Sequence, residues 1–381
     1  MQNSKYLKIT LLFSASLTIM AGATVAPSLP SMAELFHEVP NIELLTKLVL
    51  TLPSLFMAIL APLVGANINK WGRKKLMLWG MILYLFGGTS AYFLNDIYMI
   101  LLSRAILGVS IAINATVVST LIGDYFQGEE RHKYTGLQAA FVNIGGIVFI
   151  TLGGFLAEIS WRTPFLIYIA PLFLIPMVMK YIYEPTFEHH EMHAEFKMSQ
   201  VYHIFIYSFI GVIFFYMVPT QIPFLLHEKF GINGAETGLA IAAMMVTSTV
   251  MSMQYKKIKQ KISYHKAYII VTVGFGLGFI TISLAQNLLA LFLGLAIVGV
   301  GSGIMMVNTM NYLLHIASAK ARGSVVGINS SLMAISMFLS PIVIAPLTEF
   351  ITLDKTFGVL GGVMLVFSLW FIFTQKSDIK V

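Results

Sequence analysis

Hydrophobic runs of about 20 residues recur from one end of the chain to the other, and we count twelve of them. The hydrocarbon core of a bilayer is about 30 Å thick, so one helical crossing needs about 20 consecutive apolar residues. A soluble domain with 57% hydrophobic and 11% charged residues would have too little polar surface. The sequence therefore predicts an all-α integral membrane protein with twelve transmembrane helices.

The expected spans are Ile9–Pro30, Leu44–Ala66, Leu76–Leu94, Tyr98–Ile122, Thr135–Glu158, Pro164–Tyr183, Val201–Leu226, Thr237–Tyr255, Ala267–Ala285, Leu288–His315, Val325–Phe350 and Phe357–Phe373. Lys and Arg gather in alternate connections, those after spans two, four, eight and ten, whereas the intervening loops hold mainly acids. The positive-inside rule then places both termini in the cytoplasm of a multi-pass protein of the plasma membrane, here a bacterial inner membrane. This asymmetry explains the net charge of +7 without nucleic acid as a partner.

The second half of the chain repeats the first at a shift of 191 positions, since Arg131 meets Arg322 and Gly136 meets Gly327. The proline-marked end of span one, Ala26–Pro30, likewise matches Val218–Pro223 in span seven. Lys5 and Lys8 before an apolar stretch could also begin a cleavable signal peptide, but the repeat makes span one the partner of span seven. We therefore expect two pseudo-symmetric six-helix bundles, 1–183 and 201–381, joined by a polar cytoplasmic linker, 184–200. Parallel repeats of this kind are typical of transporters.

The loop after span two, Gly65 to Lys75, resembles the signature G-x-x-x-D-x-x-G-R-[RK] of the major facilitator superfamily. Further stretches of the chain resemble motifs of the twelve-span drug:proton antiporters in this superfamily. They are Gly22 with Pro27 and Pro30, Arg104-x-x-x-Gly108, Asp124 to Arg131, and Trp161-Arg162. Two positions depart from these patterns. Asn69 replaces the loop Asp, which predicts a weaker gate. Phe149-Ile150 replace the Gly-Pro of the span-five antiporter signature, whose glycines are otherwise present at Gly136, Gly145, Gly153 and Gly154.

The resemblance implies a gate at the cytoplasmic ends of spans two to four. Arg73 is expected to pair with Asp124 there and to latch the gate in one conformation. The gating residues that it implies are Gly65, Asn69, Gly72, Arg73, Asp124 and Arg131. The alternative is that the basic residues are topology signals only.

Two ionisable residues are candidates for proton coupling or substrate binding. Arg104 lies well inside span four, where an arginine costs about 2.5–3.5 kcal/mol, so a function is the default expectation. It could instead be a structural tie. Proton antiport also needs a titrating group, usually a carboxylate, and no Asp or Glu lies in the middle third of any span. Glu34, just after the Pro27/Pro30 motif, is the first choice, although it could be an ordinary loop carboxylate.

In the fold that the resemblance implies, spans one, four, seven and ten line the substrate cavity. The polar residues expected there are Thr24, Asn114, Tyr216, Gln221, Asn308, Asn311 and Tyr312. Polar side chains in lipid should face the interior or another helix, so each could equally join two helices.

The pair His189 and His193 could bind a metal at i,i+4, but it lacks a second ligand cluster, so no metal site is expected. No Walker loop and no catalytic dyad pattern is present, and we expect neither a cofactor nor enzymatic activity. The prediction is a monomeric secondary active transporter that works by alternating access and exports small amphipathic compounds, as in multidrug efflux, coupled to protons. The alternatives are an exporter of one metabolite or metallophore, a symporter or facilitator, and a non-transporting receptor.

Overall fold

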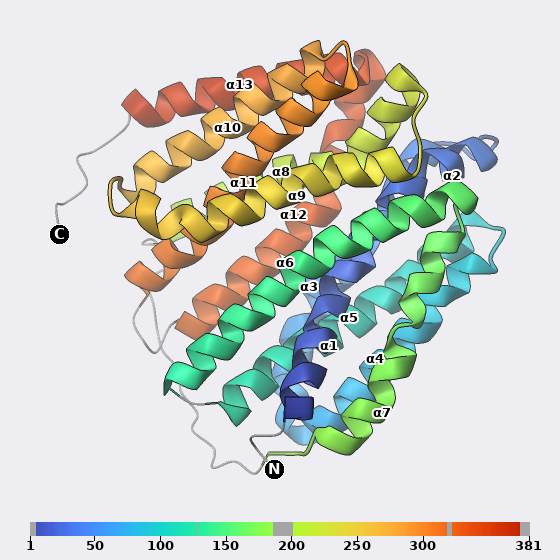
Figure 1. The fold of residues 1–381 in the computed structure, drawn as a ribbon, viewed down its shortest axis with the longest axis vertical. Coiled ribbons are helices and arrows are strands. Elements are labelled where there is room, and N and C mark those ends of the chain that lie inside the picture. Colours follow the sequence, from blue (N-terminus) through green and yellow to red (C-terminus); the bar gives the residue numbers. More distant parts are fainter. Residues whose placement is uncertain (1–4, 127, 186–200, 318–321, 374–381) are drawn as a thin grey trace. The chain divides into compact units, whose positions relative to one another are not determined.

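The computed structural model describes residues 5–126, 128–185, 201–317 and 322–373, and every regular element in these ranges is helical (Figure 1). Packing divides the chain into two compact units. Unit 1 comprises residues 1–191 and 232–239, and unit 2 comprises residues 192–231 and 240–381. The predicted all-α membrane architecture is confirmed.

Unit 1 contains α1 (Lys5–Ala23), η1 (Ala26–Ser28), α2 (Leu29–Leu35), α3 (Ile42–Trp71), α4 (Arg73–Thr89), η2 (Ser90–Tyr92), α5 (Ile97–Tyr125), α6 (Gly128–Ile159), η3 (Thr163–Ile169) and α7 (Pro171–Tyr181). Unit 2 contains α8 (Tyr202–Phe230), α10 (Tyr264–Leu284), α11 (Leu288–Ile316), α12 (Arg322–Phe350), α13 (Leu353–Phe373) and all but the first turn of α9 (Ala235–Lys259).

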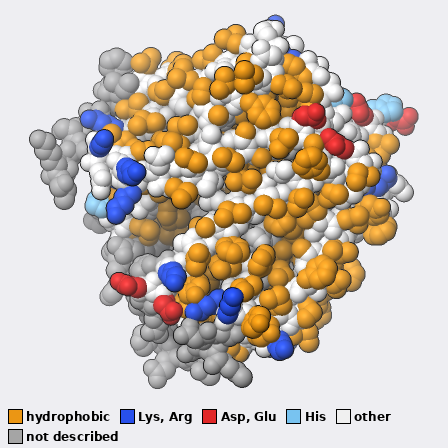
Figure 2. Space-filling model, viewed as in Figure 1, with side chains coloured by type: hydrophobic (Ala, Val, Ile, Leu, Met, Phe, Trp, Pro, Cys, Tyr) orange, Lys and Arg blue, Asp and Glu red, His pale blue; other side chains and the backbone are white. Residues whose placement is uncertain are grey.

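Ten helical segments among the described residues are long and apolar enough to cross a bilayer. Two further helices, α4 with 17 residues and α13 with 21, lie outside that set. They overlap the predicted third and twelfth spans. Hydrophobic side chains cover most of the face shown in Figure 2, as expected for helices surrounded by lipid.

Two predicted spans are interrupted where prolines occur. The first span divides into α1, η1 and α2 around Pro27 and Pro30, and the sixth divides into η3 and α7 at Pro171. Proline lacks the backbone N–H that would continue the helical ladder and its ring clashes with the preceding turn, so the helix breaks there.

In each unit, basic side chains gather where one particular pair of helices is joined, and we call this side of the unit its basic end. In unit 1 the basic end carries Lys70, Arg73, Lys74 and Lys75, where α3 turns into α4. In unit 2 it carries the lysines between positions 256 and 266, where α9 turns into α10. The described acids of unit 2 are Glu228, Glu349 and Asp354, and all three lie at the opposite helix ends.

Close backbone contacts pack α6 against residues 232–239 within unit 1. A Cβ atom on Gly154 would lie 2.8 Å from the carbonyl oxygen of Gly234 and 3.1 Å from Cα of Gly238. Beside this contact, the carboxylate of Glu158 accepts a hydrogen bond of 3.3 Å from the backbone N–H of Ala235, at the beginning of α9. Small residues let two helices approach this closely in a membrane.

Replacing Gly154 by valine should therefore destabilise unit 1, because the added side chain would overlap backbone atoms that cannot rotate away. Overpacking of this kind typically costs about 1–3 kcal/mol. The matched control is Gly136→Val in the same helix, because a Cβ atom at Gly136 meets nothing within 4 Å. Thermal unfolding of both variants in detergent measures the effect, and equal midpoints would contradict the packing argument.

Candidate functional site

A cluster of four polar side chains lies at the basic end of unit 1, and its centre is Arg73. Gly72 is the single residue between α3 and α4, with a φ angle of +81° that side chains other than glycine rarely adopt. This turn directs Arg73 inward, and its side chain is only 7% exposed.

Arg73 contacts three partners from different parts of unit 1. Its Nε donates to Asp124 Oδ2 at 2.9 Å, and its Nη2 donates to Asn69 Oδ1 at 2.7 Å. A carboxylate oxygen of Glu184 lies 3.7 Å from its Nη1. The pair that the sequence led us to expect, Arg73 with Asp124, is therefore present, and its gating role stays a prediction. We call Asn69, Arg73, Asp124 and Glu184 the basic-end cluster.

Glu184 is the member that the sequence analysis missed, since it was assigned to the linker. Its two carboxylate oxygens accept the backbone N–H groups of Arg73 at 2.7 Å and Lys74 at 3.0 Å. These are unpaired donors in the first turn of α4, where the helix dipole favours a negative charge. The adjacent Tyr183 is held as well, because the Tyr125 hydroxyl donates to its carbonyl at 2.5 Å. The sequence did offer one indication of this role, because Glu184 is an acidic residue at the end of the chain segment that meets the basic face of the membrane.

Gly65 and Arg131 are the other two predicted gating residues. A Cβ atom on Gly65 would lie 3.8 Å from Thr116 Cγ2, an ordinary contact, so close packing does not require glycine there. The Arg131 side chain lies outside the described residues, as does the pair His189 and His193.

Arg104 is fully buried in unit 1. Its Nη2 donates to the carbonyl oxygens of Gly87 at 2.8 Å and Gly88 at 2.7 Å. Both carbonyls belong to the last turn of α4, where they lack helical partners and where the dipole favours a cation. The guanidinium also lies over the rings of Phe165 and Tyr168, 4.9 Å and 5.0 Å from their centroids. Arg104 thus joins α4, α5 and η3.

The same region is joined to α1 by tyrosine hydroxyls. Tyr84 donates to the Leu17 carbonyl and Tyr168 to the Ala21 carbonyl, each at 2.8 Å. Glu34 is exposed at the end of α2 and is not among the hydrogen-bonding partners of Arg104. Glu34 and Arg104, the two candidates for proton coupling or substrate binding, are therefore not hydrogen-bonded to each other.

Replacing Arg104 by lysine should destabilise unit 1, because one ammonium cannot reproduce the planar fork over two rings and two carbonyls. Each charge-assisted hydrogen bond lost costs about 1.5–3 kcal/mol. Arg162→Lys is the control, since Arg162 also lies over an aromatic ring, 4.3 Å from Trp161, but its hydrogen bond to Asn95 is exposed. Thermal midpoints in detergent and transport per folded molecule are the measurements. A normal midpoint with lost transport would assign Arg104 to the transport chemistry instead.

The two cavity candidates of unit 1 are both buried. Thr24 donates to the Met20 carbonyl at 2.7 Å, within its own helix. Asn114 donates to the Ser110 carbonyl at 3.0 Å, and its Oδ1 is buried without a hydrogen-bond partner among the described residues. The same holds for the hydroxyls of Ser28 and Ser110. A buried polar atom without a partner indicates a site for water or a ligand.

In unit 2 the side-chain amide of Gln221 is fully buried, and neither of its polar atoms has a hydrogen-bond partner among the described residues. Gln221 lies between Pro219 and Pro223 of α8, and the sequence repeat relates this stretch to that of Ser28. Tyr216, one turn earlier, is half-buried, and its carbonyl accepts the Thr220 hydroxyl at 2.7 Å.

The three candidates of α11 have different surroundings. Asn308 is buried and joins three helices, since it accepts from Tyr255 at 2.7 Å and donates to the Tyr264 carbonyl at 3.2 Å. Tyr312 is half-buried and stacks on Tyr264, with ring centroids 4.5 Å apart. Asn311 is exposed and lines an open cavity of about 470 Å³ with Lys256 and Lys259 among its walls.

A family model of the Major Facilitator Superfamily matches residues 11–200 and 204–381, which is nearly the whole chain. The chain belongs to the major facilitator superfamily. It is therefore a multi-pass membrane protein of a transporter family, and the resemblance found in the sequence is confirmed.

Among proteins of known function, this superfamily member is 24% identical over 348 residues to the class E tetracycline resistance protein of Escherichia coli, covering 86% of this chain and 84% of that protein. It is 31% identical over 112 residues to the quinolone resistance protein NorA of Staphylococcus aureus, 29% of each chain. Solved structures with the same fold include the nucleoside transporter NupG, with a TM-score of 0.78 at 14% identity and coverage of 97% and 100%. The D-xylose-proton symporter gives 0.77, also at 14% identity, with 96% of each chain covered.

Proposed function

We propose that this protein is a secondary active transporter that works by alternating access and exports small amphipathic compounds in exchange for protons. The relatives named for resistance to tetracycline and quinolones support export of such compounds. The distribution of Lys and Arg supports an orientation with both termini and the basic ends in the cytoplasm, in a bacterial inner membrane. We take the working form to be a monomer.

The observation that carries the proposal is the basic-end cluster. A membrane protein with a purely structural role needs no charged pair at 2.9 Å between two helix ends. The side chain of Arg73 donates to residues of α3 and α5, and its backbone N–H donates to Glu184 in the segment after α7, so movement of any of these would break a charge-assisted hydrogen bond. Such a cluster can exist in two discrete arrangements, which alternating access requires.

The substrate contacts that we propose use the buried polar atoms without partners, Asn114 Oδ1 in unit 1 and the Gln221 amide in unit 2. A small number of polar groups among apolar helices suits a compound that is mainly hydrophobic and carries a few hydrogen-bonding atoms. Asn308 is a weaker candidate, since both of its amide atoms are occupied by Tyr255 and Tyr264.

Replacing Arg73 or Asp124 by alanine should abolish transport and lower stability, because removing one partner leaves the other charge nearly buried, at a cost of roughly 3–5 kcal/mol. Lys75→Ala is the control, because it removes a positive charge from the same helix turn but from an exposed position. Uptake of tetracycline into inside-out vesicles, normalised to inserted protein, measures the effect. If Arg73→Ala transports as well as Lys75→Ala, the cluster is not a gate.

Proton coupling is tested by imposing a pH gradient on the same vesicles, with the parent and Glu34→Gln compared. We expect the parent to accumulate drug only with the gradient, and Glu34→Gln to bind drug without accumulating it, since glutamine mimics the neutral carboxyl group. Glu38→Gln is the control, because it removes an exposed carboxylate four residues later. Equal rates for both variants and the parent would exclude Glu34 as the proton carrier and leave Asp124 as the next candidate.

Export itself is tested in an efflux-deficient host with a panel of tetracyclines, quinolones and lipophilic dyes. Reduced susceptibility to several unrelated compounds supports the proposal. Protection against one metabolite or metallophore only would favour a dedicated exporter, and gradient-independent equilibration would favour a facilitator.

A further inference from the structure

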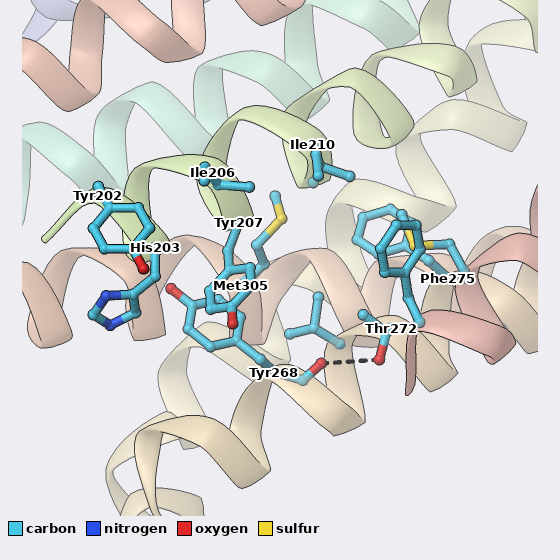
Figure 3. A pocket seen from close by; sticks show the side chains of 13 residues that line it. Tyr202, His203, Ile206, Tyr207, Ile210, Tyr268, Thr272, Phe275 and Met305 are labelled. Atoms are coloured by element: carbon cyan, nitrogen blue, oxygen red, sulfur yellow. Dashed lines mark hydrogen bonds between the residues drawn. The ribbon is translucent and has the colours of Figure 1, made fainter. Parts of the chain in front are cut away.

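A pocket of about 280 Å³ lies within unit 2, among α8, α10, α11 and α13 (Figure 3). Thirteen side chains line it, and α8 contributes six residues between Tyr202 and Gly211. These extend over about 13 Å of the helix axis, starting from its basic end. None of the predicted substrate residues belongs to this lining.

The pocket opens on a surface of unit 2 that exposes apolar side chains. Tyr202 is 54% exposed, Ile206 48% and Phe367 36%, whereas Phe275 and Met305 at the other side of the lining are buried. Outside the lining, α10 and α13 also expose large apolar residues such as Leu277 and Val366. In a membrane-spanning helix such faces are in contact with acyl chains.

Three polar side chains of the lining, those of Tyr268, Thr272 and His203, are engaged with the protein. The Tyr268 hydroxyl pairs with Thr309 at 2.9 Å, and the Thr272 hydroxyl donates to the Tyr268 carbonyl at 3.1 Å. His203 Nε2 lies 3.4 Å from the Tyr312 hydroxyl. Apart from the hydroxyls of Tyr202 and Tyr207, the remaining walls are aliphatic, aromatic and thioether groups, so the pocket mainly offers dispersion contacts to hydrocarbon.

The end of the pocket at His203 lies beside the basic end of unit 2. The His203 ring stacks on His265, with centroids 6.3 Å apart and planes at 12°, and His265 precedes the exposed Lys266 in the first turn of α10. Figure 2 shows Lys and Arg side chains gathered where α9 turns into α10. The described acids of unit 2 all lie at the opposite helix ends. An anionic group is therefore favoured at this mouth and a cation is not.

We propose that this pocket binds one acyl chain of an anionic phospholipid, whose headgroup lies at Lys266 and the beginning of α10. The apolar lining accounts for the chain and the basic rim for the headgroup. Juxtamembrane basic residues attract anionic lipid in the same way. Binding of a lipid at this site requires neither a particular substrate nor proton coupling.

The test uses the purified full-length protein in nanodiscs with trace phosphatidylglycerol or phosphatidylcholine, each with the same mid-chain diazirine. After irradiation, mass spectrometry maps the labelled peptides. We expect phosphatidylglycerol to label the segments around Ile206 and Phe367 above the lipid-facing segment around Leu277, and phosphatidylcholine to label all three alike. Equal labelling by both lipids at all segments would overturn the proposal.

Two variants separate the chain from the headgroup. Ile206→Trp fills the opening and should abolish the excess labelling, whereas Ile270→Trp, at a 37% exposed position outside the lining, should retain it. Lys266→Gln is a surface change that leaves the fold intact, and it should remove the preference for phosphatidylglycerol. Retained excess labelling in Ile206→Trp, or retained preference in Lys266→Gln, would refute the site. Displacement of the label by tetracycline would make the pocket a drug site and would also refute it.

Discussion

The bilayer interior offers no water, so backbone polar groups inside it must be paired within the protein and a charged side chain there is costly unless it is paired, and this constraint organises the structure. Arg104 is the strongest case, because a guanidinium without partners inside the membrane is costly. Its Nη2 is matched by the carbonyls that end α4, and its charge lies over two aromatic faces, whereas its Nη1 has no hydrogen-bond partner among the described residues. One residue thereby satisfies a helix terminus that would otherwise itself be unpaired.

That arrangement depends on the glycines whose carbonyls Arg104 contacts. A Cβ atom on Gly87 would lie 2.8 Å from the backbone nitrogen of Leu107, and one on Gly88 would overlap the Tyr168 side chain. Only without these side chains can α5 and η3 approach α4 closely enough for the guanidinium to reach both carbonyls. The buried arginine and the two glycines therefore form a single unit of packing, and a change to any one of them affects the other two.

The sequence predicted the spans and the Arg73–Asp124 pair well, because hydropathy, proline positions and a family signature are local patterns. It predicted the surroundings of Arg104 and Asn308 poorly, for a physical reason. Their partners are mainly backbone carbonyls and tyrosine hydroxyls brought together by helix packing, and no residue type marks a carbonyl. Glu184 was missed for a similar reason, since its role comes from proximity to an N-terminus 110 residues earlier in the chain.

Glu184 also changes what is expected from the replacement of the loop Asp by Asn69. A carboxylate at position 69 would accept N–H groups near the positive end of a helix, and its replacement by Asn predicted a weaker gate. In this structure Glu184 accepts two N–H groups at the beginning of α4, while Asn69 still accepts a hydrogen bond from Arg73. Arg73 therefore keeps two carboxylates nearby, from Asp124 and Glu184. The negative charge absent from the loop is supplied by the segment after α7, which ties the end of that helix to the basic-end cluster.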